Sequence, residues 1–377
     1  MSAVHVVDMG VVTALGSGTD ALWDGLTTGR TGLVPVRRFA TDHCAFNMAG
    51  CIPALDAEPA SSRLDVLVEM LLDGTRLSVS PDTVLLTACT KAGIDQLERS
   101  VRAQHTALDR ILGHQVADLL AGRLGLKGPR HNVSAACASA TIALALGASR
   151  IRQGQAESVL VCGLDLVSEF VFTGFASLQA LSPSTCRPFD VQRDGLTLGE
   201  GAAYVLLMSE GRLRRTKRRS LGRIAGWGIA SDAHHITAPS RTGEGLVLAI
   251  RQALVGAGLT PADLAAVNAH GTGSIYNDAM ELTAFCEVFD RLPPTHSIKG
   301  ATGHTMGACG TIETIVGLCS LKHQCIPPTV GLLTPEAQGR ACVSADVRAI
   351  SGEYLLSTNS GFGGVNASII LHRSDAS

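Results

Sequence analysis

The sequence contains few charged and few aromatic side chains. Charged residues account for 17% and aromatic residues for 4% of the 377 residues, and the formal net charge is −2. A chain with so weak an overall field offers no general attraction to nucleic acid. No apolar stretch is long enough to cross a bilayer, and the N-terminus lacks the charged and apolar segments of a secretory leader. We therefore expect a cytoplasmic protein with no nucleic-acid or membrane partner.

The cysteines lack the arrangement that disulfides or metals require. The chain has 11 cysteines, an odd number, and they are scattered without CxxC pairs or the Cys/His spacing of a zinc site. Without a secretory leader, a disulfide framework would have no oxidising compartment in which to form. We expect free thiols, a reducing environment and no bound metal.

The remaining composition is that of a large globular core, with 46% hydrophobic residues and 41 glycines. Short apolar runs alternate with helical periodicity along the whole chain, and the plan of residues 1–210 recurs in residues 221–377. Each half contains one helix of small apolar residues that must be buried on all sides, over residues 138–152 and 306–322. This repetition predicts an α/β protein built from two duplicated halves in α/β/α/β/α layers.

A basic run connects the two halves and has two interpretations. Between residues 212 and 223 the chain contains six arginines and one lysine. The run is interpreted as a solvated linker in preference to a docking patch for an acidic partner.

Cys137 lies where an expected strand gives way to the first buried helix. The first turn of a helix offers unpaired N–H groups and the positive end of its dipole, so a thiol there is expected to ionise readily and act as a nucleophile. A buried cysteine can equally be a small apolar core residue. Cys137 by itself leaves both interpretations open.

Two histidines occupy comparable turns in the second half. His270 ends a strand before a Gly-Thr-Gly-Ser loop, and His304 precedes the second buried helix. Loops at strand ends are the usual place for reactive groups. Glu313 lies inside that apolar helix, where a lone carboxylate would be costly, so we expect it to pair with Lys299. The glycine loops lack the spacing of dinucleotide or P-loop motifs, which makes a nucleotide site improbable. They are better suited to supply N–H groups around a thioester.

Several segments together resemble one family in order and spacing. The chain is similar to the elongating β-ketoacyl-acyl carrier protein synthases of fatty acid and type II polyketide pathways, which have the thiolase fold. The resemblance extends over nearly the whole chain, and it favours the nucleophile interpretation of Cys137. The segments that carry it are residues 133–139, 186–190, 199–201, 267–273, 299–304 and 359–367.

The resemblance implies a decarboxylative condensation. Cys137 would accept an acyl group from the phosphopantetheine arm of an acyl carrier protein, with the N–H groups of Cys137 and Phe362 stabilising the oxyanion. His270 and His304 would bind the thioester oxygen of a malonyl-carrier substrate. Loss of CO₂ would then leave an enolate that attacks the acyl thioester.

Further roles also follow from the resemblance alone. Phe362 would act as a gate, and the protein would bind no cofactor of its own. Its partners would be the acyl carrier protein and a second subunit, in a homodimer or in a heterodimer with a chain-length-factor-like protein. Lys299, Glu313 and Asp278 would form a network around the histidines, and Thr272 and Ser274 would bind the pantetheine arm, although the family commonly has threonine at the position of Ser274.

Two departures and two alternatives accompany this interpretation. The segments around residues 50–80 and 91–124 are shorter than is usual in the family, which favours a specialised polyketide or polyene pathway and suggests that a silent subunit completes the pocket. One alternative is an acyltransferase that forms an ester or amide from acyl-Cys137. The other is a largely non-catalytic subunit that determines chain length, against which the intact cysteine and histidines argue.

Overall fold

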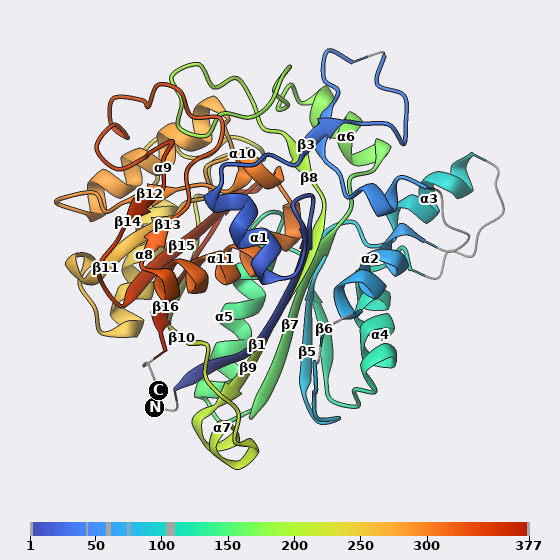
Figure 1. Ribbon diagram of the computed structural model, residues 1–377, viewed down its shortest axis with the longest axis vertical. Helices are drawn as coiled ribbons and strands as arrows, with labels where there is room; N and C mark the ends of the chain where they lie inside the picture. The colour runs from blue at the N-terminus through green and yellow to red at the C-terminus, as the bar shows by residue number, and fades with distance from the viewer. Residues whose placement is uncertain are drawn as a thin grey trace.

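The computed structural model describes residues 3–42, 44–57, 62–73, 75, 77–102 and 110–374. Ten main strands form one sheet whose halves have the same plan (Figure 1). Helix α4 spans Gly113–Leu124. The first half contains β1 (Val4–Thr13), β9 (Gly201–Ser209), β7 (Ser158–Asp165), β5 (Val84–Ala88) and β6 (Arg130–Val133). The second half contains β10 (Gly222–Ser231), β16 (Val365–Arg373), β15 (Tyr354–Gly361), β11 (Leu264–Asn268) and β12 (Thr295–His296).

The two halves repeat one pairing pattern. In the first half β1 pairs antiparallel with β9 and β9 with β7, after which β7–β5 and β5–β6 are parallel. In the second half β10–β16 and β16–β15 are antiparallel, and β15–β11 and β11–β12 are parallel. The halves join where β1 pairs with β10 over only three residue pairs, from Val4↔Ile224 to Val6↔Gly222. The expected duplication is therefore visible in the strand order itself.

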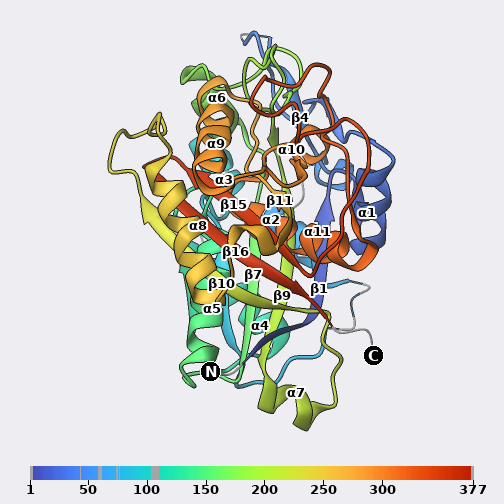
Figure 2. The same cartoon turned by 90° about the vertical axis from the view of Figure 1, so that its left-hand side faces the viewer.

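The helices form the other three layers. Two central helices, α5 (Ser139–Arg152) and α11 (Cys309–His323), pack on each other and contact strands of both halves. On one outer face α2 (Arg63–Leu72) and α4 cover the first half, and on the other α8 (Glu244–Ala257) and α9 (Ile275–Val288) cover the second. Figure 2 shows α8 lying against β10 and β16. The predicted α/β/α/β/α layering is confirmed.

Apolar burial explains why the layers stack in this order. One core cluster fills the space between the two halves and includes Leu144 of α5 and Ile315 of α11, while separate clusters lie under the outer helices. Every described residue of α11 from Cys309 to Leu321 is buried. Because a helix that is apolar on all sides must be enclosed by protein, α5 and α11 occupy the centre.

The second central helix begins later than the sequence predicts. Periodicity indicated one helix over residues 306–322, whereas the structure has a 3₁₀ turn at Met306–Ala308 followed by α11. Met306 has a φ of 51°, in the left-handed region that an α-helix cannot pass through. This turn places His304 ahead of the helix end.

Shorter elements complete the fold. The helices are α1 (Thr19–Thr27), α3 (Ile94–Val101), α6 (Glu169–Ser177), α7 (Glu210–Thr216) and α10 (Lys299–Thr302), with 3₁₀ turns at Pro53–Leu55 and Pro261–Asp263. The strands are β2 (Gly16–Ser17), β3 (Leu33–Pro35), β4 (Met48–Gly50), β8 (Leu198–Gly199), β13 (Cys325–Ile326) and β14 (Arg348–Ala349). Within the described ranges, no helix is long and apolar enough to span a membrane.

The basic run between the halves forms α7 and the turn after it. Four of its arginines lie against carboxylates: Arg212 contacts Glu157 and Asp82, Arg214 contacts Glu210, Arg215 contacts Glu157 and Arg218 contacts Asp8. These pairs offset much of the positive charge of the run, which supports the interpretation as a solvated linker.

Candidate active site

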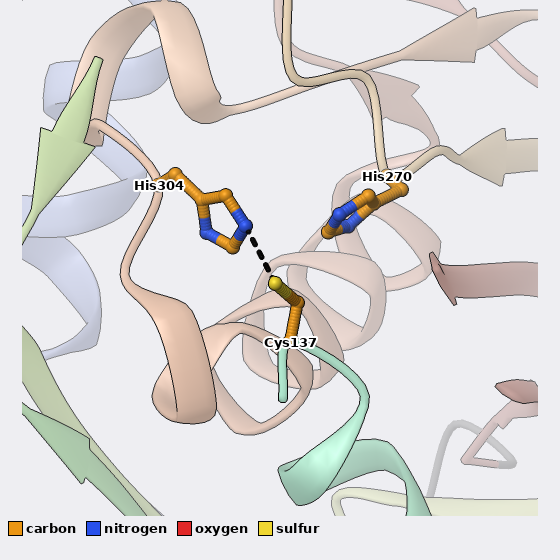
Figure 3. Close-up of side chains that lie close together, drawn as sticks. All are labelled: Cys137, His270 and His304. Carbon is orange, nitrogen blue, oxygen red and sulfur yellow. Dashed lines mark hydrogen bonds between the residues drawn. The ribbon is translucent and has the colours of Figure 1, made fainter. Parts of the chain in front are cut away.

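Cys137, His270 and His304 converge in one cavity although they come from three separate turns (Figure 3). The Cys137 Sγ lies 3.0 Å from the His304 Nε2. One ligand atom from each of the three residues lies within 4.8 Å of those of the other two, and all three residues are buried. The cavity has a volume of about 300 Å³. The structure thus brings together the three residues that the sequence singled out.

The turn before α5 aims the thiol into this cavity. Ala136 has a φ of 49°, and the Ser139 hydroxyl secures the turn by accepting the N–H of Ala135 at 2.9 Å and donating to the Ala136 carbonyl at 2.6 Å. Gly361 packs against the same turn, where a Cβ would lie 3.2 Å from the Cys137 nitrogen. A glycine at position 361 therefore lets the loop that carries Phe362 approach the thiol closely.

The acidity of this thiol differs from the sequence-based expectation. We expected the helix end to favour ionisation, but burial raises the pKa of Cys137 to about 11. The positive charge of Lys299 and the backbone N–H groups of Phe362 and Cys137 act in the opposite direction without overcoming burial. Cys137 is consequently a neutral thiol at pH 7, and its reaction requires a base.

A hydrogen bond at the far nitrogen sets the tautomer of His304. The backbone N–H of Met306 donates to the His304 Nδ1 at 3.0 Å. Burial and the charge of Lys299 hold the pKa of His304 well below its usual value, so the ring is neutral. Because Nδ1 accepts, the single ring proton of this form lies on Nε2 and points toward the Cys137 sulfur.

His270 is held in the same way by a side chain. The Asn359 amide nitrogen lies 3.1 Å from the His270 Nδ1 and 2.7 Å from the Glu313 Oε2, while the Thr141 hydroxyl donates to the Asn359 Oδ1. These partners fix the amide so that its NH₂ group donates to Nδ1. Burial, Lys299 and His304 lower the pKa of His270 well below its usual value. The neutral ring therefore also presents its Nε2–H to the cavity.

The two rings meet edge to face with their centroids 5.1 Å apart. The cavity thus contains two N–H donors beside one thiol, an arrangement suited to binding an oxygen that gains negative charge. It fits a metal poorly. A histidine that binds a metal through Nε2 usually donates its Nδ1–H to an acceptor, whereas Nδ1 here accepts hydrogen bonds from Met306 and Asn359.

Lys299 and Glu313 form the expected pair behind the histidines. The Lys299 Nζ lies 2.5 Å from the Glu313 Oε1 and 2.5 Å from the His270 carbonyl oxygen, and both side chains are buried. Burial would lower the pKa of Lys299, but the Glu313 carboxylate raises it above the usual value. The lysine therefore remains charged and contributes to keeping both imidazoles neutral.

Asp278 lies apart from this ion pair. Its carboxylate accepts the backbone N–H groups of Thr272 at 2.9 Å and of Phe189 at 2.8 Å, so it secures the loop after His270. Glu281, one turn further along α9, accepts the N–H of His270 at 2.7 Å and that of Gly271 at 2.6 Å. Burial raises the pKa of Glu281 to about 8.

Sequence reasoning assigned no role to Glu281, Asn359 or Cys309. The i, i+3 spacing of Asp278 and Glu281 on one helix could have revealed the first, because it places both carboxylates on the same helix face. Asn359 lay within a recognised motif, but nothing in the sequence indicated its contact with His270. The position of Cys309 beside His304 depends on the irregular turn at Met306.

The remaining predicted residues, Thr272, Ser274 and Phe362, line the same cavity. The hydroxyl oxygens of Thr272 and Ser274 lie 2.8 Å apart. The Phe362 ring stacks on Phe175 of α6, with the centroids 5.6 Å apart. The wall of the cavity therefore carries both polar hydroxyl groups and an aromatic pair.

A third buried histidine makes stability dependent on pH. Burial lowers the pKa of His296 to about 3, against about 6.5 in an unfolded chain. Between these values the unfolded state binds a proton that the folded state does not, so this contribution to stability is complete above pH 6.5 and is lost on acidification. The free energy of unfolding of the wild type should therefore fall by about 1.4 kcal/mol more than that of His296→Gln between pH 7.5 and 5.5.

Urea denaturation at the two pH values measures this difference. His114 is exposed on α4, so His114→Gln is the matched control and should behave as the wild type. An equal loss of stability in the wild type and in His296→Gln would contradict the prediction.

The convergence of these groups defines the class of protein. A buried thiol next to hydrogen-bond donors suits transfer of an acyl group through a thioester. Residues 71–212 match the family described as "Beta-ketoacyl synthase, N-terminal domain", and residues 221–333 match "Beta-ketoacyl synthase, C-terminal domain". The chain belongs to the β-ketoacyl synthase family, whose members are acyltransferases.

Individual relatives agree with this assignment. The chain is 30% identical over 419 residues to a 3-oxoacyl-[acyl-carrier-protein] synthase 2 of Rhizobium meliloti, with 99% of each chain covered. The structure described as the ishigamide ketosynthase/chain length factor has a TM-score of 0.91 at 28% identity, with 99% of this chain and 100% of that chain covered. A ketosynthase in complex with its chain length factor from Xenorhabdus doucetiae has a TM-score of 0.83 at 26% identity, with 99% and 98% covered. These likenesses confirm the thiolase fold.

Proposed function

We propose that this chain is a β-ketoacyl-acyl carrier protein synthase that condenses an acyl group on Cys137 with a malonyl group on a carrier protein. The observation that carries the proposal is the meeting of one thiol and two Nε2–H donors in a single buried cavity. Neither a simple hydrolase nor a binding subunit would require this pair of neutral imidazoles beside a thiol.

The first half-reaction loads the acyl group. The Cys137 thiol gives its proton to a base in the cavity, and its sulfur attacks the thioester carbonyl of the acyl-carrier substrate. The backbone N–H groups of Cys137 and Phe362 stabilise the resulting oxyanion, consistent with their position beside the sulfur. Collapse of this intermediate breaks the bond to the carrier thiol, which leaves with a proton, and forms acyl-Cys137.

The second half-reaction makes the carbon–carbon bond. The thioester oxygen of the malonyl-carrier substrate accepts hydrogen bonds from the Nε2–H groups of His270 and His304. Loss of CO₂ leaves its electron pair on the two-carbon unit as an enolate, whose oxygen is stabilised by the same donors. The enolate carbon attacks the acyl carbonyl, the carbon–sulfur bond to Cys137 breaks, and a β-ketoacyl carrier product leaves while the Cys137 thiolate takes a proton from water.

The carrier protein supplies the phosphopantetheine arm, so the enzyme needs no cofactor of its own. Thr272 and Ser274 line the cavity, where their hydroxyls can bind the amide groups of that arm. Phe362 lines the cavity with its ring stacked on Phe175, and it can act as the gate.

Mass spectrometry of the complete reaction tests this function. The purified protein is incubated with acyl-carrier protein and malonyl-carrier protein, and the acyl state of Cys137, the released CO₂ and the carrier product are measured together. We expect one CO₂ for each β-ketoacyl product, longer than the acyl donor by two carbons. Acyl transfer to an alcohol or amine without CO₂ would instead identify the ester- or amide-forming alternative.

A second subunit is part of the proposal. Within the described residues, the edge strand β6 has only β5 as a neighbour. The two helices that contact β6 carry exposed large apolar side chains, Leu112 at the start of α4 and Leu146 on α5. An open strand edge of this kind favours pairing with another chain. The partner is either a second copy or a chain-length-factor-like protein, and the shortened segments around residues 50–80 and 91–124 favour the latter, in a specialised polyketide or polyene pathway.

Light scattering on the same sample distinguishes the two partners. If the purified protein alone is a homodimer and elongates acyl groups at rates typical of a complete enzyme, the obligate heterodimer is excluded. A protein that becomes active only on addition of a second subunit would support it.

A further inference from the structure

A second thiol lies on the far side of the His304 ring from Cys137. Cys309, the first residue of α11, is buried, and its Sγ lies 3.2 Å from the His304 Nδ1. The Thr305 hydroxyl lies 3.4 Å from the same sulfur. The imidazole is therefore located between two sulfur atoms, each within hydrogen-bonding distance of one ring nitrogen.

The two half-reactions require opposite tautomers of His304. Decarboxylation requires a proton on Nε2, which the Met306 N–H supports by donating to Nδ1. Removal of the proton from Cys137 requires a lone pair on Nε2, so the ring must then carry its proton on Nδ1. An N–H group cannot accept a hydrogen bond, so Met306 offers no partner for that proton. The Cys309 sulfur can either donate through S–H or accept through a lone pair.

We propose that Cys309 is a positioning residue that lets His304 change tautomer, by accepting a hydrogen bond from Nδ1–H while His304 takes the proton of Cys137. The role of His304 in decarboxylation rests on the proposed function. Its role in taking the proton of Cys137 rests on the geometry of the site alone. The Cys309 thiol stabilises the Nδ1–H tautomer of His304, which loading of Cys137 requires. The backbone N–H of Met306 stabilises the Nε2–H tautomer, which decarboxylation requires.

The change of tautomer is an exchange with water, which takes the proton from Nε2 and returns one to Nδ1 before loading, and the reverse exchange restores Nε2–H before decarboxylation, so no net proton is gained or lost. Loading then starts from the Nδ1–H tautomer. The S–H bond of Cys137 breaks and a bond from that proton to Nε2 forms, which leaves a thiolate beside an imidazolium that carries both ring protons. Nδ1–H donates to a lone pair of Cys309, whose own S–H proton turns toward the Thr305 hydroxyl oxygen. Burial raises the pKa of Cys309 above its usual value, so it remains a neutral thiol throughout. When the carrier thiol leaves, the proton on Nε2 passes to it.

The experiment compares Cys309→Ala, which removes the acceptor, with Cys309→Ser, which keeps a group that can donate and accept. Cys319→Ala is the matched control, because it removes another buried thiol from the same helix. Two rates are measured on the full-length protein. One is alkylation of Cys137 by iodoacetamide, followed by peptide mass spectrometry, and the other is CO₂ release from malonyl-carrier protein.

We expect Cys309→Ala to slow alkylation of Cys137 about tenfold, roughly the effect of one lost hydrogen bond, and to leave CO₂ release within about twofold of the wild type. Cys309→Ser should restore most of the alkylation rate, and Cys319→Ala should match the wild type. An equal loss of both rates, or alkylation unchanged in Cys309→Ala, overturns the inference. Failure of the wild type to release CO₂ would count against the proposed function, while the alkylation result would still decide the role of Cys309.

Discussion

Replacing Cys137 with alanine is expected to abolish condensation while leaving the fold intact. The variant loses the sulfur atom that lies 3.0 Å from the His304 Nε2 inside the cavity, so product formation should fall by at least about 10⁴-fold, the scale seen when a nucleophile is removed. The two histidines remain, so CO₂ release from malonyl-carrier protein should persist. Intact mass and CO₂ release measured on one sample separate these outcomes.

A second cysteine variant controls for loss of a thiol in general. Cys325 lies in β13, away from the cavity, so Cys325→Ala should load an acyl group and condense it at the wild-type rate. Full product formation by Cys137→Ala would contradict the proposed function and favour the subunit that determines chain length without turnover.

Among the variants proposed here for stability measurements, Lys299→Met is expected to lower the free energy of unfolding most. The change leaves the Glu313 carboxylate buried without its counter-charge and removes the hydrogen bond to the His270 carbonyl. Breaking a buried pair in this way costs about 3–5 kcal/mol, because the remaining charge stays desolvated. Urea denaturation at pH 7.5 measures the change in the free energy of unfolding.

Two further variants test whether the loss of stability comes from the unpaired buried carboxylate or from removal of any paired basic side chain. Lys299→Met combined with Glu313→Gln should recover part of the stability, since no uncompensated charge is left behind. The exposed pair of Arg251 and Glu287 provides the surface control, and Arg251→Met should cost less than about 1 kcal/mol. If Lys299→Met destabilised the protein no more than Arg251→Met, the ion pair would have no part in holding the site together.

Local sequence pattern was sufficient to predict the layers, and together with the family resemblance it singled out the candidate reactive residues. The two helices of small apolar residues indicated a doubly covered centre, because a helix without a polar face has to be enclosed. Cys137, His270 and His304 stood at strand ends and helix starts, where the backbone emerges from the sheet. The position of Glu313 predicted its ion pair with Lys299, because burying an unpaired carboxylate inside that helix would cost too much free energy.

Other features depended on distances between residues far apart in the chain. The acidity of Cys137 was predicted in the wrong direction, because the helix end is a local feature whereas burial is produced by the whole fold. The contact of Asn359 with His270 spans 89 residues, and the tautomer of each histidine follows from such contacts.

The sequence by itself determined the α/β/α/β/α layers and which thiol and imidazoles are candidates for the site, because residue type and periodicity are local properties that can be read from the sequence alone. Only the tertiary structure decided which ring nitrogen carries the proton, that Glu281 holds the backbone of His270, and that Cys309 lies behind His304. The physical reason is that hydrogen bonding and desolvation act over a few ångströms, and folding alone brings these groups within that range.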